Sequence, residues 1–189
     1  NEASVKHMFV GTAALKKPGM TDAQLTPLLS AAMQRNSLTY QNETVRLTVA
    51  NLHCMTAHLP VMTRFVEELK PEEFTGVRRD GLEKTGKGLI NTLFGLTTQP
   101  LVPGSTAENS RMALDAALKY APDAIGFSLP ATRQQAVQKM NLLASKVPPA
   151  FRPDFLKVRA ILQDQSCSAV CKRLLASAPP PGTPPAVPR

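Results

Sequence analysis

The sequence predicts an all-α fold: an irregular bundle of about six or seven helices, several of them started or kinked by proline, with a Pro-rich C-terminal tail. Three observations indicate this. Apolar residues recur at alternating spacings of three and four along residues 42–70. Helix-start patterns recur before other amphipathic stretches. Prolines stand where one amphipathic stretch ends and the next begins.

The stretch 42–70 is expected to be the central helix, about 40 Å long at the rise of an α-helix. One heptad position holds Val45, Leu52, Leu59 and Val66, and the other holds Thr48, Met55, Met62 and Leu69. Pro60 predicts either a kink or two helices that meet near Ala57–Pro60, and the restriction on the residue before proline favours the break. The heptad also fits a coiled coil with another chain, but we favour a core-facing helix.

Helices are expected on both sides of the central one. Thr21 and Gln24 form a capping box, and the helix that they begin should run to about Arg35. Pro71 is expected at the first position of a helix that reaches about Gly95. The glycines inside it either allow another helix to approach closely or mark a break near Gly86–Gly88.

The second half of the chain predicts three more helical stretches. Ser105 and Glu108 form a second capping box, for a helix that stops at Pro122. Another helix opens at Pro130 and ends before Pro148-Pro149. The last starts near Phe151, and because its apolar face rotates we expect a bend near Gln163–Ser166.

These elements predict one helical domain at 21–178, with an N-terminal extension at 1–20 and a Pro-rich tail at 179–189. A chain of 189 residues suits a single domain. Its 43% hydrophobic and 19% charged residues describe a folded protein. No apolar run approaches the about 18 residues of a membrane span.

The net charge of +8 is uneven. Residues 1–94 carry 11 basic and 9 acidic side chains, or +2, whereas residues 95–189 carry 11 and 5, or +6. The basic half is therefore expected to offer a contact surface for an acidic partner. No basic run is dense, and aromatic residues make up only 5% of the chain, which argues against nucleic-acid binding.

The three cysteines, Cys54, Cys167 and Cys171, leave at least one thiol unpaired within one chain. In an oxidising compartment we expect one disulfide, either local between Cys167 and Cys171 or from Cys54 to one of them. The chain begins at Asn1, so either a precursor is cleaved there or the sequence is trimmed. We favour export to the periplasm or outside the cell; the alternative is the cytoplasm, with all thiols reduced.

Several patterns resemble chemical sites without completing them. Cys54 and His58 lie four apart, and with Cys167 and Cys171 they would give a Cys₃His metal set, although packing and surface roles are favoured. Gly81–Gly88 resembles a phosphate-binding loop, but it lacks the final Ser or Thr and a preceding buried strand. The acidic pairs at 67–68 and 72–73 flank a helix junction, and the tail has the P-x-x-P spacing of groove-binding peptides.

No motif specifies a reaction, and no cofactor is expected. The favoured function is a non-enzymatic helical interaction protein that binds a protein partner through a helix face or an interhelical groove. One alternative is a bundle that holds an apolar small molecule or lipid against its methionines. A second alternative is a thiol- or metal-dependent enzyme built around Cys54 and His58.

Overall fold

The computed structural model describes residues 17–21, 23–25, 27–28, 31–32 and 39–177. Within these residues every regular element is helical, which confirms the all-α bundle. Its longer helices are α3 (Gln41–Glu68), α4 (Gly76–Thr97), α5 (Ala107–Phe127), α6 (Pro130–Leu143), α7 (Arg152–Gln163) and α8 (Ala169–Ala176). Residues 1–16, much of the helix expected up to Arg35, and the tail from Pro179 lie outside the described residues.

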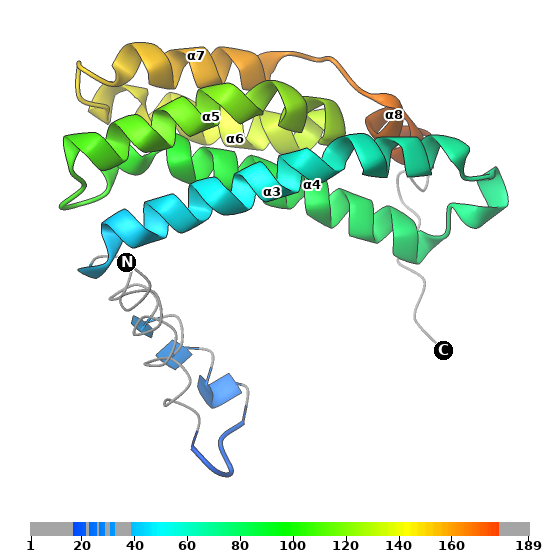
Figure 1. Ribbon diagram of the computed structural model, residues 1–189, viewed down its shortest axis with the longest axis horizontal. Coiled ribbons are helices and arrows are strands. Elements are labelled where there is room, and N and C mark those ends of the chain that lie inside the picture. Colours follow the sequence, from blue (N-terminus) through cyan, green and yellow to red (C-terminus); the bar gives the residue numbers. More distant parts are fainter. Residues whose placement is uncertain (1–16, 22, 26, 29–30, 33–38, 178–189) are drawn as a thin grey trace.

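Helix α5 lies at the centre of the bundle and packs against α3, α4, α7 and α8. Figure 1 shows α3 crossing the bundle on one side, α7 lying on the other, and the short α8 beside the far end of α3. The buried side of α5 is rich in small residues, among them Ala113, Ala117 and Ala121, which are fully buried. This small face lets several helices approach α5 at once.

The central helix is confirmed, and one row of its heptad faces the core. Val45, Leu52, Leu59 and Val66 are all buried. The other row, including Met55 and Met62, is only half-buried. The fifth buried residue of α3 is Thr56, whose hydroxyl donates to the Leu52 carbonyl 2.9 Å away. The heptad is therefore the core-facing stripe of a single chain.

Pro122 does not end its helix as expected, and at Pro60 the break that was favoured over a kink does not occur. Helix α3 runs without a break through Pro60, and α5 continues past Pro122 to Phe127. Both proline side chains are exposed. On the solvent side of a helix, water can bond the carbonyl that loses its N–H partner, so the lost hydrogen bond costs less. Leu59 and Val66, buried in one phase on either side of Pro60, favour the continuous helix.

The two expected helix starts at Pro71 and Ser105 were also wrong. Pro71–Glu73 is a separate 3-10 turn, closed by a hydrogen bond from the Lys70 N–H to the Glu73 carboxylate (2.8 Å), and α4 begins after Thr75. The N-cap of α5 is Thr106, whose hydroxyl accepts from the Asn109 N–H at 3.1 Å. Ser105 instead lies 3.2 Å from the Ser110 hydroxyl. The capping box at Thr21, by contrast, makes both expected hydrogen bonds with Gln24.

The glycines of α4 do not break it, and Gly86 allows a close approach. A Cβ on Gly86 would lie 3.0 Å from the Phe127 carbonyl oxygen and 3.2 Å from the Ser128 Cα. The end of α5 therefore packs directly on the backbone of α4. Residues 81–88 all lie inside α4, so they do not form a phosphate-binding loop.

The expected bend near Gln163–Ser166 is confirmed, and it separates two helices. Helix α7 ends at Gln163, an extended linker follows, and α8 starts at Ala169. The Asp164 carboxylate accepts from the Ser166 N–H at 2.7 Å and shapes the start of the linker. Val158 and Leu162 of α7 and Val170 and Leu174 of α8 are all buried, so the break between the helices lets both apolar faces reach the core.

Candidate functional site

The cysteines adopt the local pairing. Cys167 and Cys171 form a disulfide, with their Cα atoms 5.3 Å apart. Cys167 lies in the linker, before the N-cap Ser168, so the pair does not share one regular helix. That position allows the two Cβ atoms to point at one another. Cys54 is a free, exposed thiol, and the alternative bridge from α3 to α8 is not formed.

The histidines of α3 have different surroundings. The His53 Nδ1 lies 2.9 Å from the Tyr120 hydroxyl, so His53 joins α3 to α5. His58 is exposed. The described residues contain no group of three or more His, Cys, Asp or Glu side chains placed to hold a metal ion. The structure therefore does not assemble the Cys₃His set, and the disulfide occupies two of its sulfur atoms.

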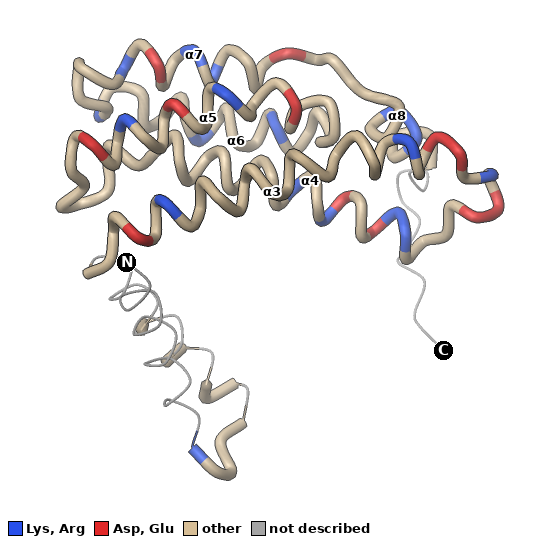
Figure 2. Tube along the Cα trace, in the orientation of Figure 1, with Lys and Arg blue, Asp and Glu red and all other residues tan. Residues whose placement is uncertain are grey.

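From Leu47 to Phe65, the side of α3 that points away from the core is exposed and carries no charged side chain of its own, although the Arg78 guanidinium of α4 lies 5.9 Å from the centre of the Phe65 ring. We call this side the outer face of α3, and it comprises Leu47, Ala50, Cys54, Ala57, Val61 and Phe65, all exposed. Val61 is 68% exposed and Phe65 52%. No Asp, Glu, Lys or Arg stands between Arg46 and Arg64. Figure 2 shows this uncharged length of helix in the middle of α3.

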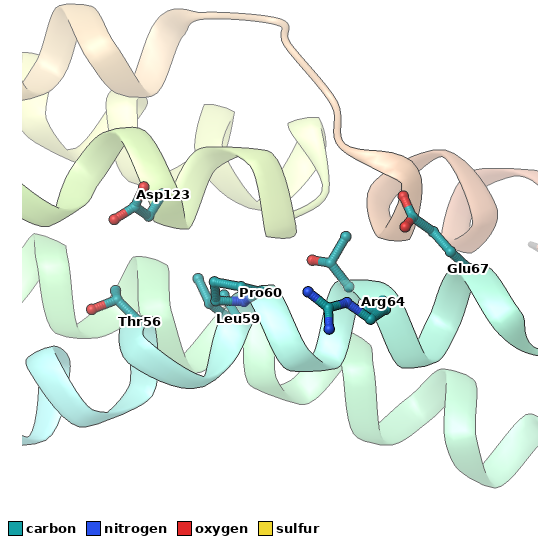
Figure 3. Close-up of a pocket in the computed structure, with 7 residues that line it drawn as sticks. Thr56, Leu59, Pro60, Arg64, Glu67 and Asp123 are labelled. Carbon is teal, nitrogen blue, oxygen red and sulfur yellow. The ribbon is translucent and has the colours of Figure 1, made fainter.

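A surface cleft of about 460 Å³ lies between α3 and α5. It is lined by Thr56, Leu59, Pro60, Thr63, Arg64, Glu67 and Asp123. Figure 3 shows Asp123, from α5, across the cleft from the α3 residues. Pro60 has no N–H to offer the Thr56 carbonyl, so the cleft lies where the α3 hydrogen-bond ladder is interrupted. Its mixed charges do not resemble an apolar ligand cavity.

The C-terminal end of α3 is held by α8. The Arg173 guanidinium donates to the carbonyls of Val66, Leu69 and Lys70. It also lies 4.9 Å from the centre of the Phe74 ring. The last carbonyls of a helix have no partners within the helix, so a guanidinium from another element caps them. Arg173 therefore attaches α8 to the end of the central helix.

A second arginine holds the linker to α5. Arg133 of α6 is fully buried, and its Nη1 donates to the Ile125 and Ser166 carbonyls, each 2.8 Å away. The Ser168 N–H donates to the Gly126 carbonyl at 3.0 Å. Burial lowers the pKa of Arg133, and the negative charge of Asp164 opposes this shift. We call Gly86, Ile125, Arg133, Ser166 and Ser168 the linker junction.

Neither arginine was singled out by the sequence analysis. Arg133 lies on the same side of α6 as the buried apolar residues Val137 and Met140, so its position in the helical period was a sequence signal of its burial. Arg152 likewise donates to the Val147 carbonyl, at 3.0 Å. Arg133, Arg152 and Arg173 of the basic C-terminal half thus all bond backbone carbonyls. Only Arg133 is buried, while Arg152 and Arg173 are half-buried, so the charge count overstates the surface available to an acidic partner by at least one charge.

No family model, curated protein or solved structure matches this chain. None of the helices in the described residues is long and apolar enough to cross a membrane.

Proposed function

We propose that this chain is a non-enzymatic interaction protein that binds a protein partner through the outer face of α3. The observation that carries this proposal is the uncharged, exposed length of helix between Arg46 and Arg64. From Leu47 to Phe65 it extends about 27 Å at the rise of an α-helix.

The other side of α3 explains why the outer face is unusual. A surface helix buries one apolar stripe and presents charged or polar residues on the opposite side. In α3 the core-facing stripe is already complete, since Val45, Leu52, Leu59 and Val66 are buried. Single exposed apolar residues are ordinary, but a continuous row on one helix marks a contact surface. The outer face is such a row, and the core does not need it.

We also infer an oxidising location, outside the cytoplasm. The support is the Cys167–Cys171 disulfide, because such bonds persist in exported proteins and are rare where thiols are kept reduced. Intact mass with thiol counting, on protein from its natural compartment, tests this inference. We expect one free thiol per chain, at Cys54. Three free thiols would exclude an oxidising compartment.

The proposed function is tested by cross-linking from the face itself. A photoactivatable maleimide attached to Cys54 should form an adduct with a protein of the same compartment. Val61→Glu places a charge on the face and should abolish the adduct. Leu142→Glu is the matched control, because Leu142 is 78% exposed on α6, away from α3, and the adduct should persist. If illumination yields no adduct that depends on Val61, the outer face of α3 is not a binding surface.

A further inference from the structure

We propose that the partner of the outer face of α3 is a second copy of the same chain, packed antiparallel, with Cys54 of each copy close to the two-fold axis. This inference rests on the proposed function, because it names the partner of the same face. A two-fold contact brings one patch against itself, so the patch must be self-complementary. The residues of α3 meet that requirement around Cys54.

The spacing of residues about Cys54 is nearly symmetric. Leu47 lies seven residues before Cys54 and Val61 seven residues after it, so in an antiparallel pair Leu47 of one copy meets Val61 of the other. Both side chains are apolar and exposed. Ala50 and Ala57, on either side of Cys54, are small and let the two backbones approach closely. The side chains at the centre of the contact are therefore small and uncharged, and larger apolar side chains lie on either side of the centre.

The charges at the ends of α3 favour the antiparallel orientation. Glu43 lies eighteen residues before Val61, a whole number of helical turns, so it belongs to the same side of the helix. Neither Glu43 nor Arg64 has an ion-pair partner among the described residues, whereas Arg46 pairs with Glu108 at 3.8 Å. Antiparallel packing brings Glu43 near Arg64 of the second copy. Parallel packing would set the two Glu43 carboxylates against each other, which is repulsive.

The size of the face sets the expected strength. A stripe about 27 Å long and about 10 Å wide covers roughly 300 Å² per copy. Stable interfaces bury about 800 Å² on each side. We therefore expect a weak dimer that dissociates on dilution.

The first experiment measures mass against concentration. Sedimentation of the Cys54→Ser chain, in which no thiol near the axis can cross-link the copies and the Cys167–Cys171 disulfide is intact, should show the 20.4 kDa monomer when dilute and a species of twice that mass when concentrated. Val61→Glu should weaken self-association at least tenfold, and Leu142→Glu should leave it unchanged. Circular dichroism should show that both variants stay folded. A chain that remains monomeric at millimolar concentration overturns the proposal.

The second experiment determines the orientation. In a Cys54→Ser background, Leu47→Cys and Val61→Cys chains of different mass are mixed and oxidised with diamide, which takes up the two hydrogen atoms lost when two thiols join. Antiparallel packing predicts mixed Leu47→Cys to Val61→Cys dimers, at least fivefold above either like pair. A predominance of like pairs indicates parallel packing and overturns the proposed arrangement.

Alternatives to a second copy on the outer face of α3 would give different results in labelling and cross-linking at Cys54. If residues 1–38 of the same chain cover the face, the Cys54 thiol of the dilute monomer reacts slowly with a maleimide and faster after that segment is removed. If the photo-cross-linker on Cys54 captures only a different protein, the proposed function stands and the self-association is wrong. If it captures nothing that depends on Val61, both proposals fail.

Discussion

The linker junction and the outer face of α3 differ in which side chains they bury and which they expose. At the junction, Arg133 is fully buried and bonds two carbonyls from different elements, and Gly86 lies against the end of α5. On the outer face, Val61 and Phe65 are more than half exposed. The linker junction therefore buries a charged side chain inside the molecule, whereas the outer face of α3 exposes apolar side chains to solvent.

This difference shows which region the fold requires. Arg133 to Ser166, Ser168 to Gly126 and Gly86 to Phe127 join segments more than thirty residues apart, so a change at the junction should destabilise the whole bundle. On the outer face, the Phe65 ring contacts Arg78 of α4, but Val61 is 68% exposed and Phe65 52%, so burial within the bundle does not explain why the face is apolar. Substitutions that separate stability from association test this comparison.

The largest effect is expected at Arg133. Arg133→Ala leaves the Ile125 and Ser166 carbonyls without their donor and opens a cavity, and it should lower the free energy of unfolding by about 3–5 kcal/mol. Urea denaturation measures the change. Arg133→Met, which fills much of the space without a buried charge, should lose less. If alanine costs under about 1 kcal/mol, the junction does not hold the linker and α5 together.

Gly86→Ala is expected to cause the next largest loss of stability. Its Cβ would lie 3.0 Å from a backbone oxygen, which cannot move without moving α5, so we expect a loss of about 1–3 kcal/mol despite the better helix propensity of alanine. Gly88→Ala is the matched control in the same helix, because its Cβ meets only the flexible end of Met55 at 3.8 Å. The control should be neutral or stabilise the protein by up to about 1 kcal/mol. Equal melting temperatures for the two variants would contradict the close approach.

The positions of the helices were predictable from sequence because buried residues recur every three or four positions in a helix. This spacing of apolar residues is visible within a short stretch of sequence. Val45, Leu52, Leu59 and Val66 gave both the extent of α3 and its buried side. The prolines were less reliable, because Pro60 and Pro122 favoured helix ends that do not occur. Pro60 and Pro122 lie on the solvent side of helices whose buried residues stay in phase, and whether a proline faces solvent depends on the tertiary structure.

The site was less predictable, for a related reason. Periodicity identifies the side of a helix that is buried, but it does not say whether the other side is solvated or covered by a partner. The uncharged run between Arg46 and Arg64 was visible in the sequence, yet it became informative only once the opposite side was known to fill the core. Arg133 and Arg173 act on carbonyls more than thirty and a hundred residues away along the chain, and no local pattern indicates such a contact.

An exposed ion cluster offers a milder test of polar contacts. The carboxylate of Asp154 accepts from Lys157 at 3.0 Å and from Arg111 at 2.6 Å, and these partners hold the pKa of Asp154 below its ordinary value. A lowered pKa in the folded state stabilises the protein above the unfolded pKa, near 4, and this contribution is lost as the pH falls further. Asp154→Asn should cost up to about 1 kcal/mol at pH 7, and this cost should shrink steadily as the pH falls below about 4. A cost that is independent of pH would mean that packing, and not charge, is responsible.

The smallest effect on stability, and the sharpest separation of the two regions, is expected at Val61. Val61→Ala removes two methyl groups that are already in water, so the free energy of unfolding measured on dilute monomer should change by less than about 0.5 kcal/mol. Leu52→Ala, the same kind of truncation on the buried side of α3, should cost about 2–5 kcal/mol. Self-association should respond in the opposite way, since Val61→Ala weakens it in a chain that is as stable as the original. A Val61 variant that unfolds as readily as the Leu52 variant would place Val61 within the fold and remove the reason for assigning it to an interface.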